Sequence, residues 1–167
     1  MNNQTVVFDD HSAVRAKAAA DSEETRQFVT FILGEQHYCV DIRLVREIRA
    51  GNVITPLPSA PEFVRGVINL RGTIVPIIDL RTRFGQGRTE ASQNHVVVIV
   101  AIGGRLNGLL VDGVSDILAV RASEVAPIPE TDGDSRDPFF DGLITQGDSM
   151  MILIAVERLL NNAGRLS

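Results

Sequence analysis

Cysteine, tryptophan, tyrosine and lysine are nearly absent from this sequence. Cys39 is the one cysteine, so no disulfide can form within the chain and no cluster of thiolates can bind zinc. With no tryptophan and a single tyrosine, the chain lacks an aromatic platform on which nucleic-acid bases could stack. Lys17 is the one lysine, and it lies in the polar first part of the chain. We therefore expect neither a Schiff-base lysine nor a P-loop lysine within the fold.

Long hydrophobic runs and an excess of positive charge are absent as well. The longest apolar runs, Val96–Ile102 and Met150–Val156, have seven residues, whereas a membrane-spanning helix needs about 20. The first residues do not have the charged and then apolar segments of a secretory signal. The net charge of −5 gives no general attraction to nucleic acid. The expectation is a soluble cytoplasmic protein that neither binds nucleic acid nor inserts into a membrane.

The sequence does contain enough apolar residues for a core, arranged in short strand-like runs. Hydrophobic residues make up 44% of the 167 residues, which suits one domain or two small ones. From residue 27 onward, runs rich in valine and isoleucine alternate with turns that contain glycine and proline, a pattern typical of all-β proteins. Residues 1–26 are polar and alanine-rich, and we expect a flexible tail there. Apolar spacing over residues 156–164 predicts a short C-terminal helix.

The strand pattern occurs twice along the chain. One constant shift in numbering carries Gly34 onto Gly103, and a slightly larger shift carries Gly66 onto Gly142. The change of shift falls in a proline-rich loop, where insertions are tolerated. Glycines and apolar positions that match in this way indicate an internal duplication of a five-stranded unit. Because five short strands in about 50 residues suit a small closed barrel, we expect one barrel over 27–84 and another over 94–156.

Residues that could carry catalysis or bind a metal do not form a recognisable site. His37 and Cys39 share one face of a predicted strand, but no second such pair completes a metal site. The run Gly85-Gln86-Gly87 lacks the third glycine and the following helix of a dinucleotide-binding turn. We therefore expect no metal, no cofactor and no enzymatic activity. A pair of carboxylates brought together by the fold is the catalytic arrangement that the sequence leaves open.

One run of residues points to recognition of other proteins. Ile42, Val45 and Ile48 are more apolar positions than one buried face of a strand uses, since Val45 has the opposite parity. One interpretation is that Val45 is exposed in an apolar patch beside Arg46 and Glu47, which would suit protein binding. The other is that a bend or a bulge returns all three apolar side chains to the core.

The segment from Gly66 to Leu80 is the second such feature. Two β-branched runs flank a short turn closed by Gly72, which predicts a β-hairpin because glycine can adopt the positive φ of a tight turn. A hairpin requires neither Asn69 nor Arg71 at its turn. Arg71, with its planar fork of donors, is therefore either a partner-binding residue or a solvated side chain.

Three segments, in this order, resemble the CheW family of chemotaxis coupling proteins. They are Tyr38–Arg49 (YCVDIRLVREIR), Phe63–Leu80 (FVRGVINLRGTIVPIIDL) and Gly108–Ile117 (GLLVDGVSDI). The resemblance extends over residues 26–162 and departs from the family at Cys39, where a glycine is common. It implies an all-β fold of two pseudo-symmetric five-stranded SH3-like barrels, followed by a short C-terminal helix.

The resemblance also implies a function and a set of site residues. It implies a non-enzymatic adaptor, recruited to membrane-associated receptor arrays, that couples methyl-accepting chemoreceptors to the regulatory domain of the histidine kinase CheA. In the family the receptor tip binds in a groove between the barrels. The positions that match this groove are Ile42, Val45, Glu47, Val96 and Ile117. The positions that match a second partner surface, for receptor or kinase, are Gly66, Asn69, Arg71 and Gly72.

Two related functions are alternatives to this one. The chain could be a coupling paralogue of a non-flagellar chemosensory or surface-motility pathway, with different receptors and a different kinase. It could also be a fragment related to the regulatory domain of the kinase itself, although 167 residues leave no room for an ATPase domain.

Overall fold

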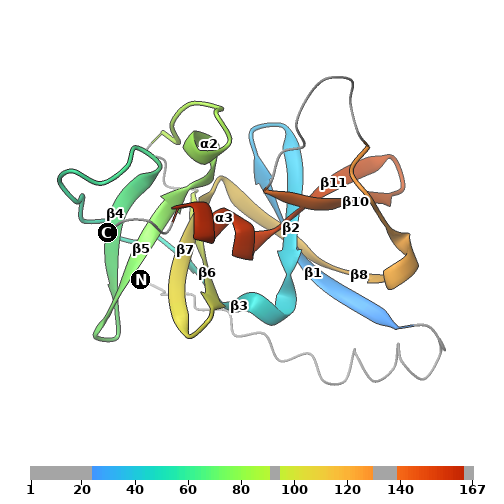
Figure 1. The fold of residues 1–167 in the computed structure, drawn as a ribbon, viewed down its shortest axis with the longest axis horizontal. Coiled ribbons are helices and arrows are strands. Elements are labelled where there is room, and N and C mark those ends of the chain that lie inside the picture. The colour runs from blue at the N-terminus through green and yellow to red at the C-terminus, as the bar shows by residue number, and fades with distance from the viewer. Residues whose placement is uncertain (1–23, 91–94, 130–138, 164–167) are drawn as a thin grey trace.

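Residues 24–90, 95–129 and 139–163 are described by the computed structural model, and they form two β-sheets with short helices (Figure 1). Sheet A has five strands, in the order β3 (Val45–Ala50), β6 (Val96–Ile102), β7 (Arg105–Val111), β5 (Thr73–Asp79) and β4 (Val64–Leu70). Sheet B has six strands, in the order β8 (Gly113–Arg121), β1 (Thr25–Leu33), β2 (Gln36–Asp41), β11 (Ser149–Ile154), β10 (Phe140–Gln146) and β9 (Val125–Ala126). The expected all-β class is confirmed.

Within the described ranges, four short helices connect or follow these strands. They are the 3₁₀ turns η1 (Ile42–Leu44) and η2 (Ala122–Glu124) and the α-helices α2 (Leu80–Arg83) and α3 (Val156–Ala163). The predicted C-terminal helix is therefore confirmed. Of the expected tail over 1–26, residues 1–23 lie outside the described part of the chain, and Thr25 and Arg26 belong to β1. No helix among the described residues is long and apolar enough to cross a membrane.

Each sheet takes strands from both halves of the chain. The β1–β2 hairpin lies in sheet B with β8–β11, and the β6–β7 hairpin lies in sheet A with β3–β5. Parallel pairing of β2 with β11 and of β5 with β7 holds the exchanged hairpins in place. We expected residues 27–84 to supply all strands of one barrel and residues 94–156 all strands of the other, and this expectation is therefore wrong. A tight turn specifies the pairing within a hairpin, but which sheet that hairpin joins depends on contacts with distant strands.

The two sheets are nevertheless related by the duplication. The larger of the two shifts in numbering carries β4 onto β10. Apart from β9, which has no counterpart in sheet A, the two sheets have the same strand order when β1–β2 and β6–β7 are treated as equivalents. Even the β-bulges correspond: Arg65 is the extra residue in β4, and Asp141 is the extra residue in β10. Likewise, Arg46 is extra in β3 and Ser115 in β8. The pseudo-symmetry predicted from the sequence is confirmed.

Both sheets curl until their edges approach each other. In sheet B, η2 links the edge strands β8 and β9 directly. In sheet A, Thr55 and Val67 exchange two backbone hydrogen bonds of 2.9 Å, which join the chain after β3 to the opposite edge strand, β4. Such curling leaves few unpaired strand edges. It supports small barrels, and their SH3-like classification stays a prediction.

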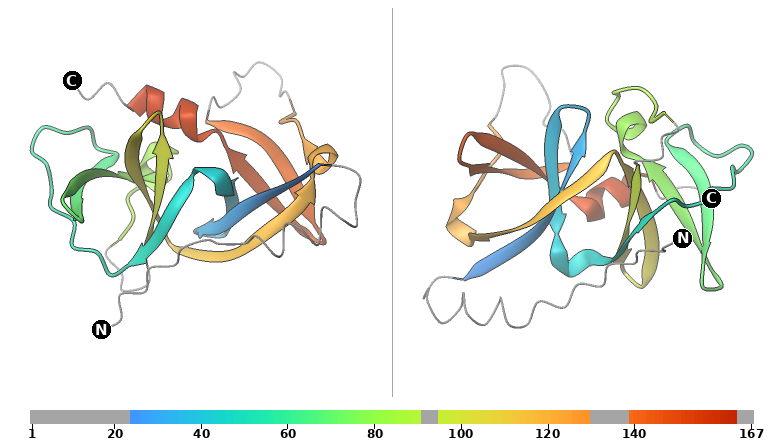
Figure 2. Two further views of the ribbon diagram at one scale, coloured as in Figure 1. Left: turned by 90° about the horizontal axis from the view of Figure 1, so that it is seen from below. Right: turned by 180° about the vertical axis from the view of Figure 1, so that it is seen from behind.

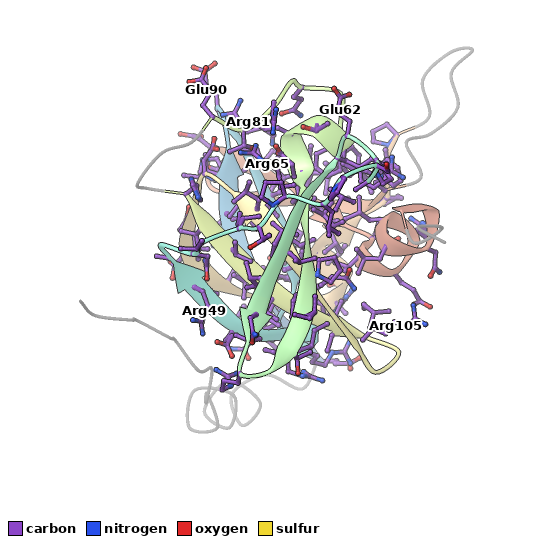
Figure 3. The ribbon with its side chains drawn as sticks, turned by 90° about the vertical axis from the view of Figure 1, so that its left-hand side faces the viewer. Arg49, Glu62, Arg65, Arg81, Glu90 and Arg105 are labelled. Atoms are coloured by element: carbon purple, nitrogen blue, oxygen red, sulfur yellow. The ribbon has the colours of Figure 1, made fainter. Side chains whose placement is uncertain are left out.

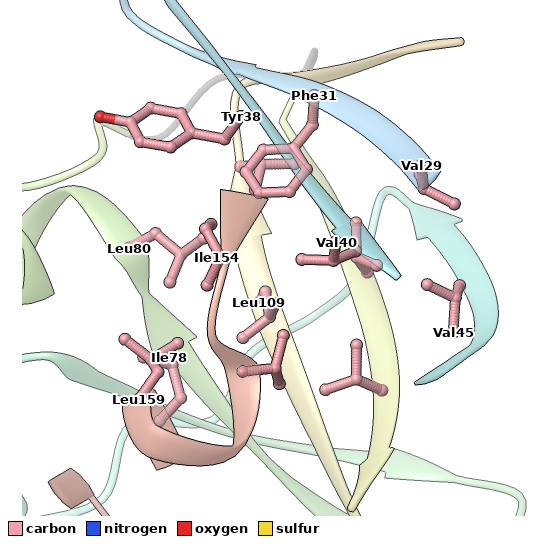
Figure 4. Packing of buried hydrophobic residues seen from close by; sticks show 14 of the residues in the cluster. Val29, Phe31, Tyr38, Val40, Val45, Ile78, Leu80, Leu109, Ile154 and Leu159 are labelled. Carbon is pink, nitrogen blue, oxygen red and sulfur yellow. The ribbon is translucent and has the colours of Figure 1, made fainter. Parts of the chain in front are cut away.

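The curled sheets enclose three apolar clusters. One lies inside sheet A and comes from β4–β7, and one lies inside sheet B and comes from β1, β2, β8, β10 and β11. The largest lies between the sheets and includes Val40 of sheet B, Leu109 of sheet A, and Leu159 of α3 (Figure 4). The three views show α3 packed where the two sheets meet (Figures 1 and 2). The inter-sheet cluster therefore fixes the two curled sheets against each other.

Candidate functional site

The turn η1 decides how the residues around Val45 are placed. Asp41 caps this turn, since its Oδ1 accepts a hydrogen bond of 2.9 Å from the backbone N–H of Arg43. The turn and the bulge at Arg46 change the direction of the chain, so Val45 is buried in the inter-sheet cluster while Arg46 is exposed. Of the two interpretations drawn from the sequence, the bend and bulge that return Val45 to the core describe the structure.

Three of the five residues expected in a groove are brought together. Ile42, Val45 and Val96 all contact the inter-sheet cluster, Val45 as a buried member and the other two as half-buried neighbours. Ile117 does not belong to this cluster; it lies on edge strand β8 of sheet B, with 38% of its surface exposed. Glu47 is buried, and its side chain is directed to a different partner.

Glu47 forms an ion pair with Arg71 at the tip of the β4–β5 hairpin. Nη2 of Arg71 lies 2.5 Å from Oε1 of Glu47, and Nη1 of Arg49 lies 3.1 Å from Oε2. Arg49 is itself held by Asn52, whose Oδ1 accepts a hydrogen bond of 3.1 Å from its Nε. One residue of the expected groove and one of the expected hairpin surface therefore belong to a single charged cluster. Figure 3 shows Arg49 toward the end of sheet A where this hairpin turns.

The charges of this cluster favour an ionised Glu47. The hydrogen bond from Arg71 lowers the pKa of Glu47 most strongly, burial raises it, and the hydrogen bond from Arg49 lowers it again. The resulting pKa lies below the ordinary value for glutamate, so the carboxylate stays charged at neutral pH. The Glu47–Arg71 ion pair links edge strand β3 to the turn that follows the opposite edge strand, β4. It is a second link between the two edges of sheet A, in addition to the Thr55–Val67 bridge.

The turn residues hold Arg71 in position for this pair. Arg71 has a φ of 51° and Gly72 a φ of 90°. The backbone N–H of Gly72 donates a hydrogen bond of 2.8 Å to Oδ1 of Asn69, which stabilises the turn. The Arg71 side chain is still 67% exposed, so its guanidinium has further donors directed to solvent. Of the two alternatives drawn from the sequence, a solvated side chain describes Arg71 only in part, because Glu47 accepts a hydrogen bond from it, and a partner-binding role stays a prediction.

Gly66 has a structural requirement of its own. It is buried with a φ of 146°, and a Cβ added there would lie 2.1 Å from the carbonyl oxygen of Thr55. The close approach of the backbone at the Thr55–Val67 bridge therefore requires glycine. This fold requirement accounts for Gly66 without a contact to a partner.

Sequence reasoning missed two exposed apolar residues of sheet A. Ile74 of β5, opposite Asn69 in the register, is 59% exposed, and Val53, in the loop after β3, is 86% exposed. Together with Asn69, Arg71 and Gly72, Ile74 forms what we call the tip surface. The sequence contained the information to find Ile74. Successive side chains of a strand point to opposite faces, so Ile74 lies on the face opposite to that of its neighbour Val75, which is buried.

Sequence reasoning also missed a buried polar cluster at the other end of sheet A. Asp79 is fully buried and accepts hydrogen bonds from Thr89 N (2.9 Å), Thr89 Oγ1 (2.6 Å) and Arg65 Nη1 (3.0 Å). Arg65 also donates to the carbonyl oxygen of Thr89 at 2.6 Å. The cluster attaches the linker after α2 to the bulge of β4. Its position in Figure 3, marked by Arg65, is distant from Arg49 and the tip surface.

The carboxylates of both clusters are held in their ionised form by arginine. Each carboxylate is paired with arginine, which keeps it ionised and unsuited to act as a proton donor at neutral pH. Burial raises the pKa of the Cys39 thiol to about 12, so it is not a nucleophile. Among the described residues, no group of three or more His, Cys, Asp or Glu side chains could hold a metal ion.

Comparison with known proteins gives a consistent result. Residues 27–164 match the family model described as CheW-like domain. The chain is 41% identical over 137 residues to a chemotaxis protein CheW of Klebsiella aerogenes, covering 82% of each chain. It is 38% identical over 140 residues to a chemotaxis protein CheW of Rhizobium meliloti, covering 84% of this chain and 90% of that one.

A solved structure shares the fold. The crystal structure of the scaffolding protein TtCheW from Thermoanaerobacter tengcongensis superimposes with a TM-score of 0.77 at 35% sequence identity. The match covers 86% of this chain and 98% of the other. A family model over nearly all described residues, relatives above one-third identity and a common fold lead to one conclusion: the chain belongs to the CheW family.

Proposed function

We propose that this chain is a non-enzymatic adaptor that couples methyl-accepting chemoreceptors to the histidine kinase CheA. Its membership of a family of chemotaxis scaffolding proteins, over the whole folded domain, is the observation that carries the proposal. The chemistry of the hairpin tip supports it, because the Glu47–Arg71 ion pair holds an exposed arginine in a defined position. Coupling would place the protein at the membrane-associated receptor arrays, with no insertion into the membrane.

The receptor surface is proposed at the junction of the two sheets. Ile117 is exposed and Ile42 is half-buried, so these two would contact the receptor directly. Val45 and Glu47 are buried, and Val96 is half-buried. Their part would be to support the backbone of β3 and β6 beneath the contact residues. Apolar residues with a charged rim are the usual composition of such an interface.

The tip surface is proposed as a second contact, for the receptor or the kinase. Arg71 keeps donors directed to solvent, and Ile74 adds an exposed apolar side chain beside it. Arginine next to apolar surface is enriched among the residues that dominate binding energy. Asn69 and Gly72 would act by holding the turn that presents Arg71.

Reconstitution of receptor-dependent kinase activity tests the proposal. A receptor cytoplasmic fragment, CheA and this chain are mixed, the complex is isolated by gel filtration, and CheA autophosphorylation is measured. The wild-type chain is expected to co-elute with both proteins and to raise receptor-controlled phosphorylation. Failure of the chain to bind either protein, with a folded sample, would contradict the proposal.

Two arginine variants, one in the tip surface and one outside it, provide a matched comparison. Arg71→Ala is expected to lower kinase activation about tenfold, whereas Arg105→Ala removes another exposed arginine of sheet A and is expected to have no effect. Figure 3 shows Arg105 away from Arg49 and its cluster. Equal activation by the two variants would remove Arg71 from the partner surface.

A coupling function in a different chemosensory or surface-motility pathway is the second candidate. The same fold and family would serve it, and the difference lies in which receptors and which kinase are bound. The same reconstitution, repeated with kinases and receptors of each pathway encoded in the same genome, distinguishes the two by which pair is activated.

A further inference from the structure

The segment that follows β5 reaches across from sheet A to sheet B with four side chains, those of Arg81, Arg83, Phe84 and Gln86. Nη2 of Arg81 donates a hydrogen bond of 2.6 Å to Oδ2 of Asp112, and the same oxygen accepts one of 2.7 Å from the backbone N–H of Gly34, in the β1–β2 turn of sheet B. Nε2 of Gln86 donates a hydrogen bond of 3.0 Å to the hydroxyl oxygen of Tyr38, on β2. We call residues 80–86 the staple.

The third side chain, Arg83, lies between two aromatic rings. Its guanidinium carbon is 4.5 Å from the ring centre of Phe63, which precedes β4 of sheet A. It is 4.3 Å from the ring centre of Phe139, which precedes β10 of sheet B. At these distances the cation is attracted to the faces of both rings. Next to it, Phe84 contacts Tyr38, Phe139 and Phe140 of sheet B, with ring centres 5.5, 6.2 and 5.2 Å apart.

The two rings occupy equivalent places in the duplicated fold. Phe63 and Phe139 are related by the same shift in numbering that carries β4 onto β10. Each accepts a backbone hydrogen bond of 2.7 Å from the end of its hairpin, Phe63 from Asp79, the last residue of β5, and Phe139 from Ala155, the residue after β11. Arg83 therefore contacts the same corner of sheet A and of sheet B. In α3, the equivalent of α2, the matching residue is Leu159, which is buried in the inter-sheet cluster.

We propose that the staple sets the relative orientation of the two sheets, and that Arg83 is its positioning residue. Apolar packing in the inter-sheet cluster is not directional, so it allows small rotations of one sheet against the other. A planar guanidinium held between two rings, together with two hydrogen-bonded links, restricts that rotation.

The consequence for function rests on the adaptor proposal above. The tip surface belongs to sheet A and Ile117 to sheet B, so a partner bound at the tip and a partner bound at Ile117 are related across the junction of the sheets, in addition to the Glu47–Arg71 pair within sheet A. A difference in binding at one surface reaches the other only through an element with defined arrangements. The staple supplies a stiff connection at that junction.

Distance measurement between the sheets tests the staple without any partner. Spin labels are attached at Arg105→Cys in sheet A and Gln146→Cys in sheet B, both exposed positions. The native Cys39 is buried and stays unlabelled. The distance distribution is expected to broaden in Arg83→Leu, which keeps bulk and removes the charge and planarity. Arg83→Lys, which keeps the charge alone, is expected to broaden it as well, to a smaller extent.

Kinase reconstitution tests the consequence. In Arg83→Leu, binding of the receptor fragment alone and of CheA alone is expected to stay within twofold of wild type, while receptor control of the kinase falls about fivefold. A general loss of stability would lower both binary affinities together and would not produce this split. If Arg83→Leu does not fold, Phe139→Leu removes only the ring on sheet B, and the same results are expected from it.

Each result bears on one part of the inference. An unchanged distance distribution in folded Arg83→Leu overturns the staple. A broadened distribution with unchanged receptor control supports the staple and overturns its role in coupling. If the wild-type chain does not couple receptor to kinase at all, the adaptor proposal fails. The distance measurement alone then tests whether the staple sets the relative orientation of the two sheets.

Discussion

At the scale of single residues, paired charges connect two of the positions that the sequence singled out, Glu47 and Arg71. Arg71 lies at a hairpin tip, yet its guanidinium is bonded to the buried carboxylate of Glu47. Arg49 pairs the second oxygen of that carboxylate. Because Arg49 keeps Glu47 partly neutralised, the loss of Arg71 does not leave the buried charge without a partner. We therefore expect Arg71→Ala to affect function more than folding.

Asn69 offers a test of how the tip surface works. If Asn69 acts by holding the turn that presents Arg71, Asn69→Ala lowers kinase activation less than Arg71→Ala does. The double variant is then expected to be no worse than Arg71→Ala, because both changes act through the same contact. Autophosphorylation of reconstituted complexes measures all three variants. A double variant that is worse by the product of the single effects would show an independent role for Asn69.

Asp79 predicts a pH dependence of stability. Burial raises the pKa of Asp79, but the hydrogen bonds from Thr89 and Arg65 together lower it below its ordinary value. The folded state therefore favours the ionised form. This contribution is present above the pKa of aspartate in the unfolded chain, about 3.9, and is lost as the pH falls toward the lower folded-state value.

The variant Asp79→Asn tests this prediction. It removes the charge that pairs with Arg65 in a buried site, and we expect the free energy of unfolding at pH 7 to fall by about 3 kcal/mol. The difference from wild type is expected to shrink as the pH falls below about 4. Urea denaturation at a series of pH values measures it. A difference that is constant with pH would show that the pKa of Asp79 is the same in the folded and unfolded chains.

At the scale of elements, the bridge between the two edges of sheet A depends on a glycine. Gly66→Ala would place a Cβ against the carbonyl group of Thr55 and would impose an unfavourable φ. We expect it to separate Thr55 from Val67 and to lower the free energy of unfolding by about 3 kcal/mol. Urea denaturation provides the measurement.

Gly113→Ala is the matched control for this element. A Cβ at Gly113 would meet nothing within 4 Å, and its φ is not in the left-handed region. The same substitution is therefore expected to leave stability within about 0.5 kcal/mol of wild type. Equal stability of the two variants would mean that the close approach at Gly66 relaxes without cost.

At the scale of the whole molecule, the exchange of hairpins makes each half of the chain depend on the other. Sheet A lacks β6 and β7 without the second half, and sheet B lacks β1 and β2 without the first. Both halves also contribute to the inter-sheet cluster. The two halves are therefore one folding unit, although the duplication divides the sequence in two.

Splitting the chain in the exposed linker, between Gly87 and Arg88, tests this dependence. Each fragment alone is expected to show no cooperative unfolding transition, and an equimolar mixture is expected to recover the β-sheet circular dichroism and the transition of the intact chain. Thermal unfolding followed by circular dichroism measures both. A fragment that unfolds cooperatively as a monomer would show that one half can complete its own sheet.

Local features of the fold could be predicted from the sequence alone. The β4–β5 hairpin, the helix at the C-terminus, the duplication and Arg71 as a residue beyond the needs of a turn were all predicted. Each depends on residues close together in the chain or on a repeated pattern, since hydrophobic periodicity and glycine-containing turns are local properties. Family resemblance added the expected positions of the partner surfaces, because it carries information about residues that are far apart.

Only the tertiary structure decided which distant residues meet. It placed β1–β2 and β6–β7 in each other's sheets, buried Val45, bonded Arg71 to Glu47 and set Arg83 between Phe63 and Phe139. Parity along a strand says which residues share a face, but a 3₁₀ turn and a bulge changed that face at Val45. The sequence therefore determined the elements and their repetition. Their exchange and their ion pairs follow from contacts between segments that no local pattern relates.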